Sequence, residues 1–267
     1  MDERSLALRR TIIRMMAAGK RGHLGSACSL VEILRVLYDE FLRVDPRDPR
    51  WPLRDRCILS KGHGCLALYA ILADKGFFPT EELWRFCHAE GILGGHPEHG
   101  KIPGVEASTG SLGHGLAIGI GFALNARHAR AGHRVVVVMS DGEMNEGSVW
   151  EAALCAAKHR LSHLTVLIDY NKQQSYGPTA EVCDLEPLAD KWRAFGFAVE
   201  EVDGHSLDAL RSVLARVPLD PRKPSALICH TIKGKGIPIA EGNPEWHHKS
   251  KLTEEDAQGL LAALEAA

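Results

Sequence analysis

Two oxygen-bearing side chains directly follow apolar runs of the sequence, where a polar group is costly to bury without a partner. Asp141 follows the run 135–140 and precedes Gly142, and Asn171 follows the run 164–170. Magnesium prefers hard oxygen ligands, takes few of them from protein, and completes its octahedron with phosphate and water. Each residue alone fits an ordinary turn. As a pair, they favour a site for Mg²⁺ and a phosphorylated ligand.

The elements around this pair predict that the two side chains meet. The apolar runs 135–140 and 164–170 read as strands, and the segment 148–160 between them has helical periodicity. Such a unit keeps both strands parallel, so both end at the same sheet edge. Ligands of open α/β folds bind beyond that edge. We therefore expect an α/β fold, a mostly parallel β-sheet with helices on both faces.

Other segments extend the same pattern to both ends of the chain. We expect further strands at 55–60, 197–205 and 225–232, and further helices at 5–19, 29–42, 65–76, 116–132, 207–217 and 253–267. Gly19 is a candidate C-cap. The pairs Ser29 with Glu32 and Ser148 with Glu151 have capping-box spacing. We expect residues 1–267 to form one domain, with loops at 20–28 and 91–115.

Composition narrows the class of protein. The 267 residues are 45% hydrophobic with a net charge of −2, which indicates a globular core and gives no polybasic field for nucleic acid or an anionic membrane. The seven cysteines form no C-x-x-C pair, so buried free thiols are expected. The start of the chain lacks the apolar stretch of a signal peptide, and no membrane span is apparent. We expect a cytoplasmic location.

Several of the fourteen histidines lie in glycine- or proline-bearing loops rather than on apolar faces. A single such histidine is more often structural or merely exposed. "HPEH" at 96–99 suggests zinc, but no further ligands accompany it at a convincing spacing. "GIGFAL" at 119–124 lacks the third glycine of a dinucleotide fingerprint. We regard His88, His128, His133, His159, His163 and His205 as ordinary, and Glu143 as a solvated side chain.

The motifs together resemble the transketolase family. "SDG" at 140–142 with Asn171 is similar to the thiamin diphosphate motif, a G-D-G followed by Asn. Other matching segments occur in the expected order: "GHLGSACS" (22–29), "LSKGHGCLALYAIL" (59–72), "GGHPE" (94–98), "PGVEASTGSLGHGL" (103–116) and "TIKGKG…NPEWHHK" (231–249). The resemblance implies a thiamin diphosphate-binding fold similar to the N-terminal domain of transketolases. It also implies that the pyrimidine-binding and C-terminal domains belong to a separate subunit.

The resemblance implies a role for each matching position. Asp141, Asn171 and the carbonyl of Gln173 would bind Mg²⁺, or Ca²⁺ or Mn²⁺ in its place. His63 and His247 would contact the diphosphate or the reacting centre, and His23 and His96 would hold and protonate donor oxygens. The cofactor-binding set comprises His63, Gly110, Ser111, Leu112, Gly113, Asp141, Gly142, Asn171 and His247, with Leu112 against the thiazolium. Glu146 and Glu151 match acidic positions at the family's subunit interface, and Glu151 also fits a capping box.

Four positions depart from the family pattern. Ser140 replaces the first glycine of G-D-G, Ser111 stands where proline is usual, His114 replaces a common glutamine, and Tyr176 replaces an aspartate. The last three bear on the pocket around cofactor and donor, so they leave the sugar open more than the cofactor.

The leading hypothesis is the N-terminal subunit of a split transketolase, a transferase that moves a two-carbon ketol unit from a ketose (phosphate) to an aldose (phosphate). Its partner would be the subunit carrying the pyrimidine-binding domain, in an α2β2 heterotetramer. Pentose phosphates are the default substrates, and a specialised catabolic sugar is the variant. The alternatives are a 2-oxo acid dehydrogenase component, a deoxyxylulose-phosphate synthase, and a non-catalytic module that kept the pocket. The histidines at 23, 63, 96 and 247 argue against the first.

Overall fold

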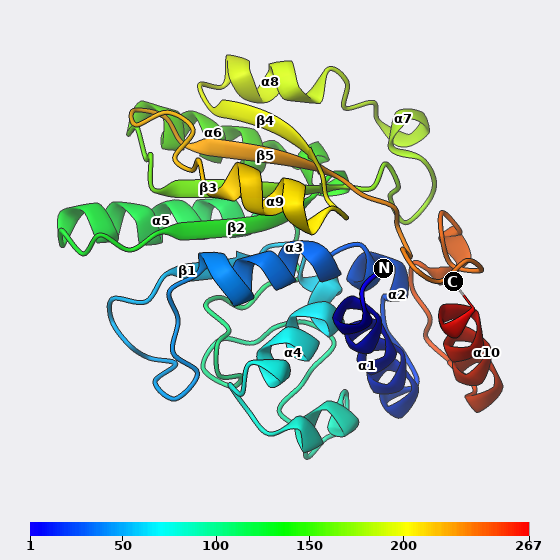
Figure 1. Ribbon diagram of the computed structural model, residues 1–267. Coiled ribbons are helices and arrows are strands. Elements are labelled where there is room, and N and C mark those ends of the chain that lie inside the picture. Colours follow the sequence, from blue (N-terminus) through cyan, green and yellow to red (C-terminus); the bar gives the residue numbers. More distant parts are fainter. Residues whose placement is uncertain (267) are drawn as a thin grey trace.

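A five-stranded, fully parallel sheet forms the centre of the computed structural model, which describes residues 1–266 (Figure 1). Its strands are β1 (Arg56–Leu59), β2 (Val135–Ser140), β3 (Leu164–Tyr170), β4 (Ala198–Asp203) and β5 (Ser225–His230), in the spatial order β1-β2-β3-β5-β4. All five predicted strands are confirmed. In β2 and β3 every residue is buried, as expected for parallel strands covered on both faces.

Ten α-helices of the described residues accompany the sheet. They are α1 (Glu3–Gly19), α2 (Leu24–Cys28), α3 (Val31–Val36), α4 (Cys65–Asp74), α5 (Gly115–His128), α6 (Gly147–Lys158), α7 (Thr179–Val182), α8 (Leu188–Ala194), α9 (Leu207–Leu214) and α10 (Glu254–Glu265). A π-helical turn, Leu37–Phe41, extends α3, and short 3₁₀ segments lie at Gly62–Gly64, Thr80–Arg85, Gly142–Asn145 and Pro244–Trp246. None of the helices that the structure describes is long and apolar enough to cross a bilayer.

The alternation of side chains along the strands divides the interior into two cores. Val136 and Val138 pack with α1, α3 and α4, whereas Val135, Val137 and Met139 pack with α5, α6 and α8. Figure 1 shows α1, α2 and α4 gathered below the sheet, with α10 beside α1. The predicted α/β architecture with helices on both faces is therefore confirmed.

Three local predictions about helix ends are wrong because tertiary contacts use the same residues. Gly19 is the last residue of α1, and the left-handed C-cap is Lys20, with φ of 55°. A Cβ at position 19 would lie 2.5 Å from a ring carbon of Phe86, so the glycine permits close packing. Neither predicted capping box forms.

The predicted box residues have other partners. Glu32 pairs with Arg9 across the core, and the Ser29 hydroxyl donates to Asp169. The Ser148 hydroxyl donates to the carbonyl of Gly113. In addition, α2 lies within the predicted loop 20–28, and sequence periodicity did not predict α7 or α8.

Candidate active site at the carboxyl edge of the sheet

A cavity of about 250 Å³ opens where β1, β2, β3 and β5 end. Its lining includes most of the predicted site residues: His23, His63, His96, Gly110, Leu112, Asp141, Gly142, Asn171, Gln173 and His247. Segments up to 224 residues apart in the sequence therefore converge, since His23 and His247 both line it. The predicted convergence of Asp141 and Asn171 at one sheet edge is confirmed.

The oxygens of Asp141 and Asn171 are held by neighbouring backbone groups. Asp141 is 1% exposed, and its carboxylate accepts from the amides of Gly142 (2.7 Å) and Lys172 (2.6 Å). Asn171 Oδ1 accepts from the amide of Gln173 at 3.1 Å. Burial and the nearby charge of Asp169 raise the pKa of Asp141 to about 6. A cation at this position would offset both effects, so the donor set fits a hard divalent metal.

Four predicted histidines form a cluster over the cavity. The His23 ring lies 5.3 Å from His63, 6.3 Å from His96 and 5.4 Å from His247, centroid to centroid. Burial and the charges of neighbouring groups lower the pKa of His23 and of His247 to about 3, and burial also lowers the pKa of His63 and His96. Neutral imidazoles can both donate and accept, which suits proton exchange with substrate oxygens.

A fifth histidine and two lysines at the site were not predicted. The His248 ring lies 4.6 Å from that of His23. Lys61 is fully buried and pairs with the equally buried carboxylate of Asp169. Lys233 Nζ donates to the carbonyls of Gln173 (3.0 Å) and Gln174 (3.2 Å). Two ammonium groups on the lining favour an anionic ligand such as a diphosphate.

Asp169 connects the cavity wall to the core. It accepts hydrogen bonds from Lys61, from the Ser29 hydroxyl (2.6 Å) and from the Thr231 hydroxyl. Burial alone would raise the pKa of Asp169, but the Lys61 charge and these hydrogen bonds hold it below the usual value. The carboxylate therefore stays ionised and fixes Lys61 beside the cavity.

Glu143 contradicts the prediction of a solvated side chain. It is fully buried, and one carboxylate oxygen accepts from the Ser60 hydroxyl and from the amide of Gly113 at 2.8 Å. Burial raises its pKa, since hydrogen bonding offsets only part of the desolvation. Glu143 thus ties the loop 110–113 to the ends of β1 and β2.

The glycine-rich loop provides a close approach to the histidine cluster. Gly110 has φ of 142°, and a Cβ there would lie 2.8 Å from Cδ2 of His96. Leu112 lines the cavity, whereas Gly113 is buried beneath it, with φ of 84°. The cradle at Gly110 would be filled by any side chain, which agrees with a bound group in this space.

Several predicted positions lie outside the main cavity. Ser111 and His114 line a neighbouring concavity of about 490 Å³ together with Ile118. Glu146 and Glu151 are exposed at the start of α6. The Tyr176 side chain is 91% exposed and does not line the cavity, so the expectation that it alters the pocket finds no contact in this chain.

Among residues 1–266, all seven cysteines are free, and four of them are buried. The same residues contain no group of three or more His, Cys, Asp or Glu side chains placed to hold a metal ion. This finding gives no support to zinc at 96–99, in agreement with the spacing of the sequence. A site made of one carboxylate, one amide and one carbonyl lies outside that search.

The fold and the cavity define a thiamin diphosphate-binding domain. The family model described as "Transketolase, thiamine diphosphate binding domain" matches residues 3–264, and the chain belongs to the transketolase family of transferases.

Relatives with names of their own cover most of the chain. It is 43% identical over 244 residues to "6-deoxy-6-sulfo-D-fructose transketolase subunit SqwG" of Clostridium sp. (strain MSTE9), covering 91% of this chain and 88% of that protein. It is 41% identical over 250 residues to one of the subunits named for the apulose-4-phosphate transketolase of Actinobacillus succinogenes, covering 93% and 90%. The chain is thus similar to proteins named as transketolase subunits.

The fold is also that of solved transketolases. The transketolase of Leishmania mexicana superposes with a TM-score of 0.91 at 31% identity, covering 98% of this chain. The chain spans 40% of that protein's length. The predicted thiamin diphosphate-binding fold is therefore confirmed.

Proposed function

We propose that this chain is one of two kinds of subunit in a transketolase that moves a two-carbon ketol unit from a ketose to an aldose. The observation that carries the proposal is the single cavity in which Asp141, Asn171 and four histidines converge. The match to the thiamine diphosphate-binding domain supports it.

In this proposal each wall of the cavity has a separate task. Asp141, Asn171 and the carbonyl of Gln173 hold Mg²⁺, or Ca²⁺ or Mn²⁺, and the metal with Lys61 and Lys233 neutralises the diphosphate. Leu112, with Gly110, Ser111, Gly113 and Gly142, shapes the space for the rings. When bound, thiamin diphosphate supplies a thiazolium that stabilises a carbanion.

The histidine cluster handles protons. His63 and His247 face the reacting centre, and His23 and His96 hold and protonate oxygens of the donor. Because their pKa values lie below the usual range, the imidazoles are neutral before substrate arrives. Each ring then takes up a proton only as negative charge develops on a substrate oxygen.

A partner that supplies the pyrimidine-binding domain completes the site. The exposed surface of α5 and α6 fits that partner, because it carries the apolar side chains Ile118 (36% exposed) and Leu154 (58%) and continues from the concavity beside Leu112. A Cβ at Gly121 or Gly147 would meet nothing within 4 Å, so another backbone can approach closely. Glu146 and Glu151 lie on this surface, which supports the predicted interface role.

We further propose that residues 1–267 form a single domain of a cytoplasmic α2β2 heterotetramer. Its donor is a specialised catabolic ketose rather than an ordinary pentose phosphate. The support comes from the relatives, which are named for 6-deoxy-6-sulfo-D-fructose and for apulose 4-phosphate.

The test is an assay of ketol transfer by this chain, alone and mixed with the subunit that carries a pyrimidine-binding domain. The donors are 6-deoxy-6-sulfo-D-fructose, apulose 4-phosphate and xylulose 5-phosphate. Transfer is expected only with both subunits, and faster from the first or second donor. Robust transfer by the isolated chain would refute the partner requirement, and preference for xylulose 5-phosphate would refute the specialised donor. Absence of magnesium-dependent thiamin diphosphate binding by the mixture, measured by calorimetry, would refute the enzyme.

A further inference from the structure

The segment that follows β5 carries Lys233 into the cavity and is held at successive residues. The amide of Thr231 donates to the carbonyl of Tyr170 (3.1 Å), and the amide of Gly234 donates to the carbonyl of Gly25 (3.0 Å). Between and beyond these contacts, the segment is held by two side chains from distant elements. They are His205, from the loop between β4 and α9, and Arg9, from α1.

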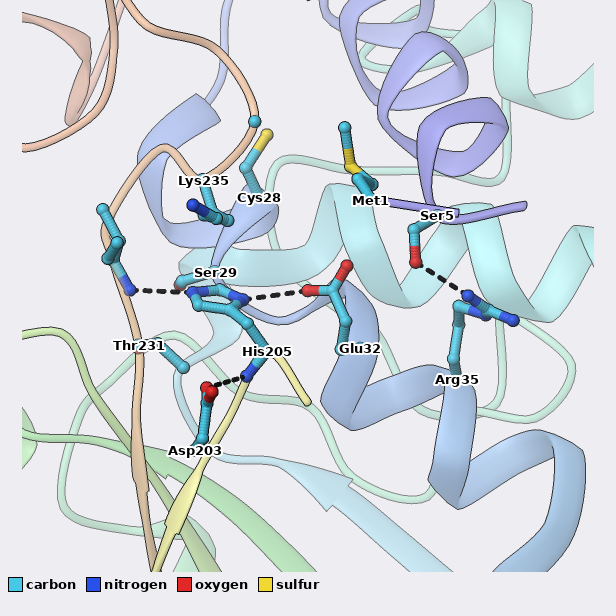
Figure 2. Close-up of polar contacts among 12 residues, drawn as sticks. Met1, Ser5, Cys28, Ser29, Glu32, Arg35, Asp203, His205, Thr231 and Lys235 are labelled. Atoms are coloured by element: carbon cyan, nitrogen blue, oxygen red, sulfur yellow. Dashed lines mark hydrogen bonds and ion pairs between the residues drawn. The ribbon is translucent and has the colours of Figure 1, made fainter. Parts of the chain in front are cut away.

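His205 holds the residue immediately before Lys233. Its Nε2 accepts the amide hydrogen of Ile232 at 2.8 Å. A backbone N–H only donates, so Nε2 carries no proton and Nδ1 must carry one. Nδ1 lies 3.0 Å from a carboxylate oxygen of Glu32 and donates to it. Figure 2 shows the His205 ring between Glu32 and the segment of Thr231 and Lys235.

Arg9 holds the segment on the other side of Lys233. Its Nε donates to the carbonyl of Lys235 at 2.6 Å. The fully buried guanidinium also donates twice to Glu32, at 2.6 and 2.9 Å, and to the carbonyl of Cys28 at 2.9 Å. One carboxylate therefore orients both side chains that grip the segment.

The Glu32 carboxylate is a fixed anion in this arrangement. Burial would raise its pKa, but the hydrogen bonds from His205 and Arg9 and the charge of Arg9 lower it to about 2. An ionised Glu32 accepts from His205 Nδ1 across the whole range in which the protein would work. The tautomer that leaves Nε2 free for Ile232 is thereby selected.

We propose that His205, with Glu32 and Arg9 behind it, is a positioning residue for Lys233, and that it sets where the lysine's ammonium meets the diphosphate of the cofactor. The inference rests on the proposed function for its cofactor. The network itself belongs to this chain alone. His205 touches neither the cavity nor any reacting atom, so its effect passes through the backbone at Ile232.

Two substitutions separate the positioning contact from the rest of the network. In His205→Asn the amide can occupy the place of Nδ1 and still donate to Glu32, but it is too short to reach Ile232. In His205→Gln the amide oxygen can occupy the place of Nε2 and still accept from Ile232, while the donor to Glu32 is lost. Both variants remove the imidazole, so each controls for the other.

The first readout is amide hydrogen exchange of the segment 231–236, which requires no cofactor. Loss of one buried hydrogen bond is expected to speed exchange there by about tenfold in His205→Asn. His205→Gln is expected to stay within about twofold of the unchanged protein. The second readout is thiamin diphosphate affinity with Mg²⁺ in the two-subunit complex, where His205→Asn is expected to bind about tenfold more weakly and His205→Gln nearly normally.

Equal effects of the two substitutions, or no effect of His205→Asn on exchange, would overturn the proposal. If the unchanged complex binds no thiamin diphosphate, the proposed function fails, while exchange still decides whether His205 positions the segment. If His205→Asn does not fold, nitrogen NMR of the unchanged protein decides, because a proton on His205 Nε2 instead of Nδ1 would contradict the arrangement.

Discussion

Replacing Asp141 by Asn should make the metal-free chain more stable while removing its metal site. The carboxylate is almost fully buried, and burial with the charge of Asp169 raises its pKa from 3.8 to about 6. At about 1.4 kcal/mol per pKa unit, the ionised group destabilises the metal-free fold by about 3 kcal/mol near pH 7. Asn can accept only one of the two backbone hydrogen bonds, which returns about 1–2 kcal/mol. The expected net gain in the free energy of unfolding is about 1–2 kcal/mol.

The pH dependence gives this prediction a second sign. Because the folded pKa of Asp141 is raised, its penalty is full above about pH 6 and fades as the carboxyl becomes protonated. The advantage of Asp141→Asn should therefore shrink by about 1.5 kcal/mol between pH 7 and pH 5.

Urea unfolding in the presence of a chelator measures both effects. Asp190→Asn is the matched control, because the same change falls on an exposed carboxylate of α8 and should alter stability by less than about 0.5 kcal/mol. With Mg²⁺ present, Asp141→Asn should weaken thiamin diphosphate binding by about 100-fold or more. A less stable metal-free variant, or unchanged cofactor affinity, would refute the reasoning.

Three other perturbations have defined outcomes. Lys61→Met should lower the free energy of unfolding by about 3–5 kcal/mol, because the buried Asp169 loses its cation, and the double variant with Asp169→Asn should recover part of the loss in urea unfolding. Gly110→Ala should raise the KM for the donor, because its Cβ would displace the His96 ring, whereas Gly76→Ala, also at positive φ but in open space, should cost only stability; equal kinetics of the two would contradict this. Chelation of divalent ions should abolish cofactor binding in calorimetry, and Mg²⁺, Mn²⁺ or Ca²⁺ should restore it; binding that survives chelation would contradict a metal site.

The part of the site that sequence could predict follows from short-range order. The apolar runs before Asp141 and Asn171 identify two strands, and one crossover helix fixes both ends at the same edge. The four clustered histidines were predicted from motif resemblance, since nothing in their spacing indicates that His23 and His247 approach to 5.4 Å.

The unpredicted part depends on pairings between distant residues. Lys61 and Asp169 are 108 positions apart, and Asp169 lies inside an otherwise apolar strand without a local signal. Glu143 looks exposed from its neighbours in sequence, but the chain folds Ser60 and Gly113 onto it. The capping box at Ser29 and Glu32 fails for the same reason, because Arg9 and Asp169 offer these side chains stronger partners than a helix end does.

The apolar side chains on α5 and α6 have a consequence for the cell that makes this protein. Ile118 and Leu154 lie on the surface of the chain as it folds alone. Copies synthesised in excess of their counterpart would expose this surface to chaperones and proteases and would tend to stick to one another. Balanced synthesis of the two polypeptides, as from one shared transcript, would keep such orphan molecules scarce.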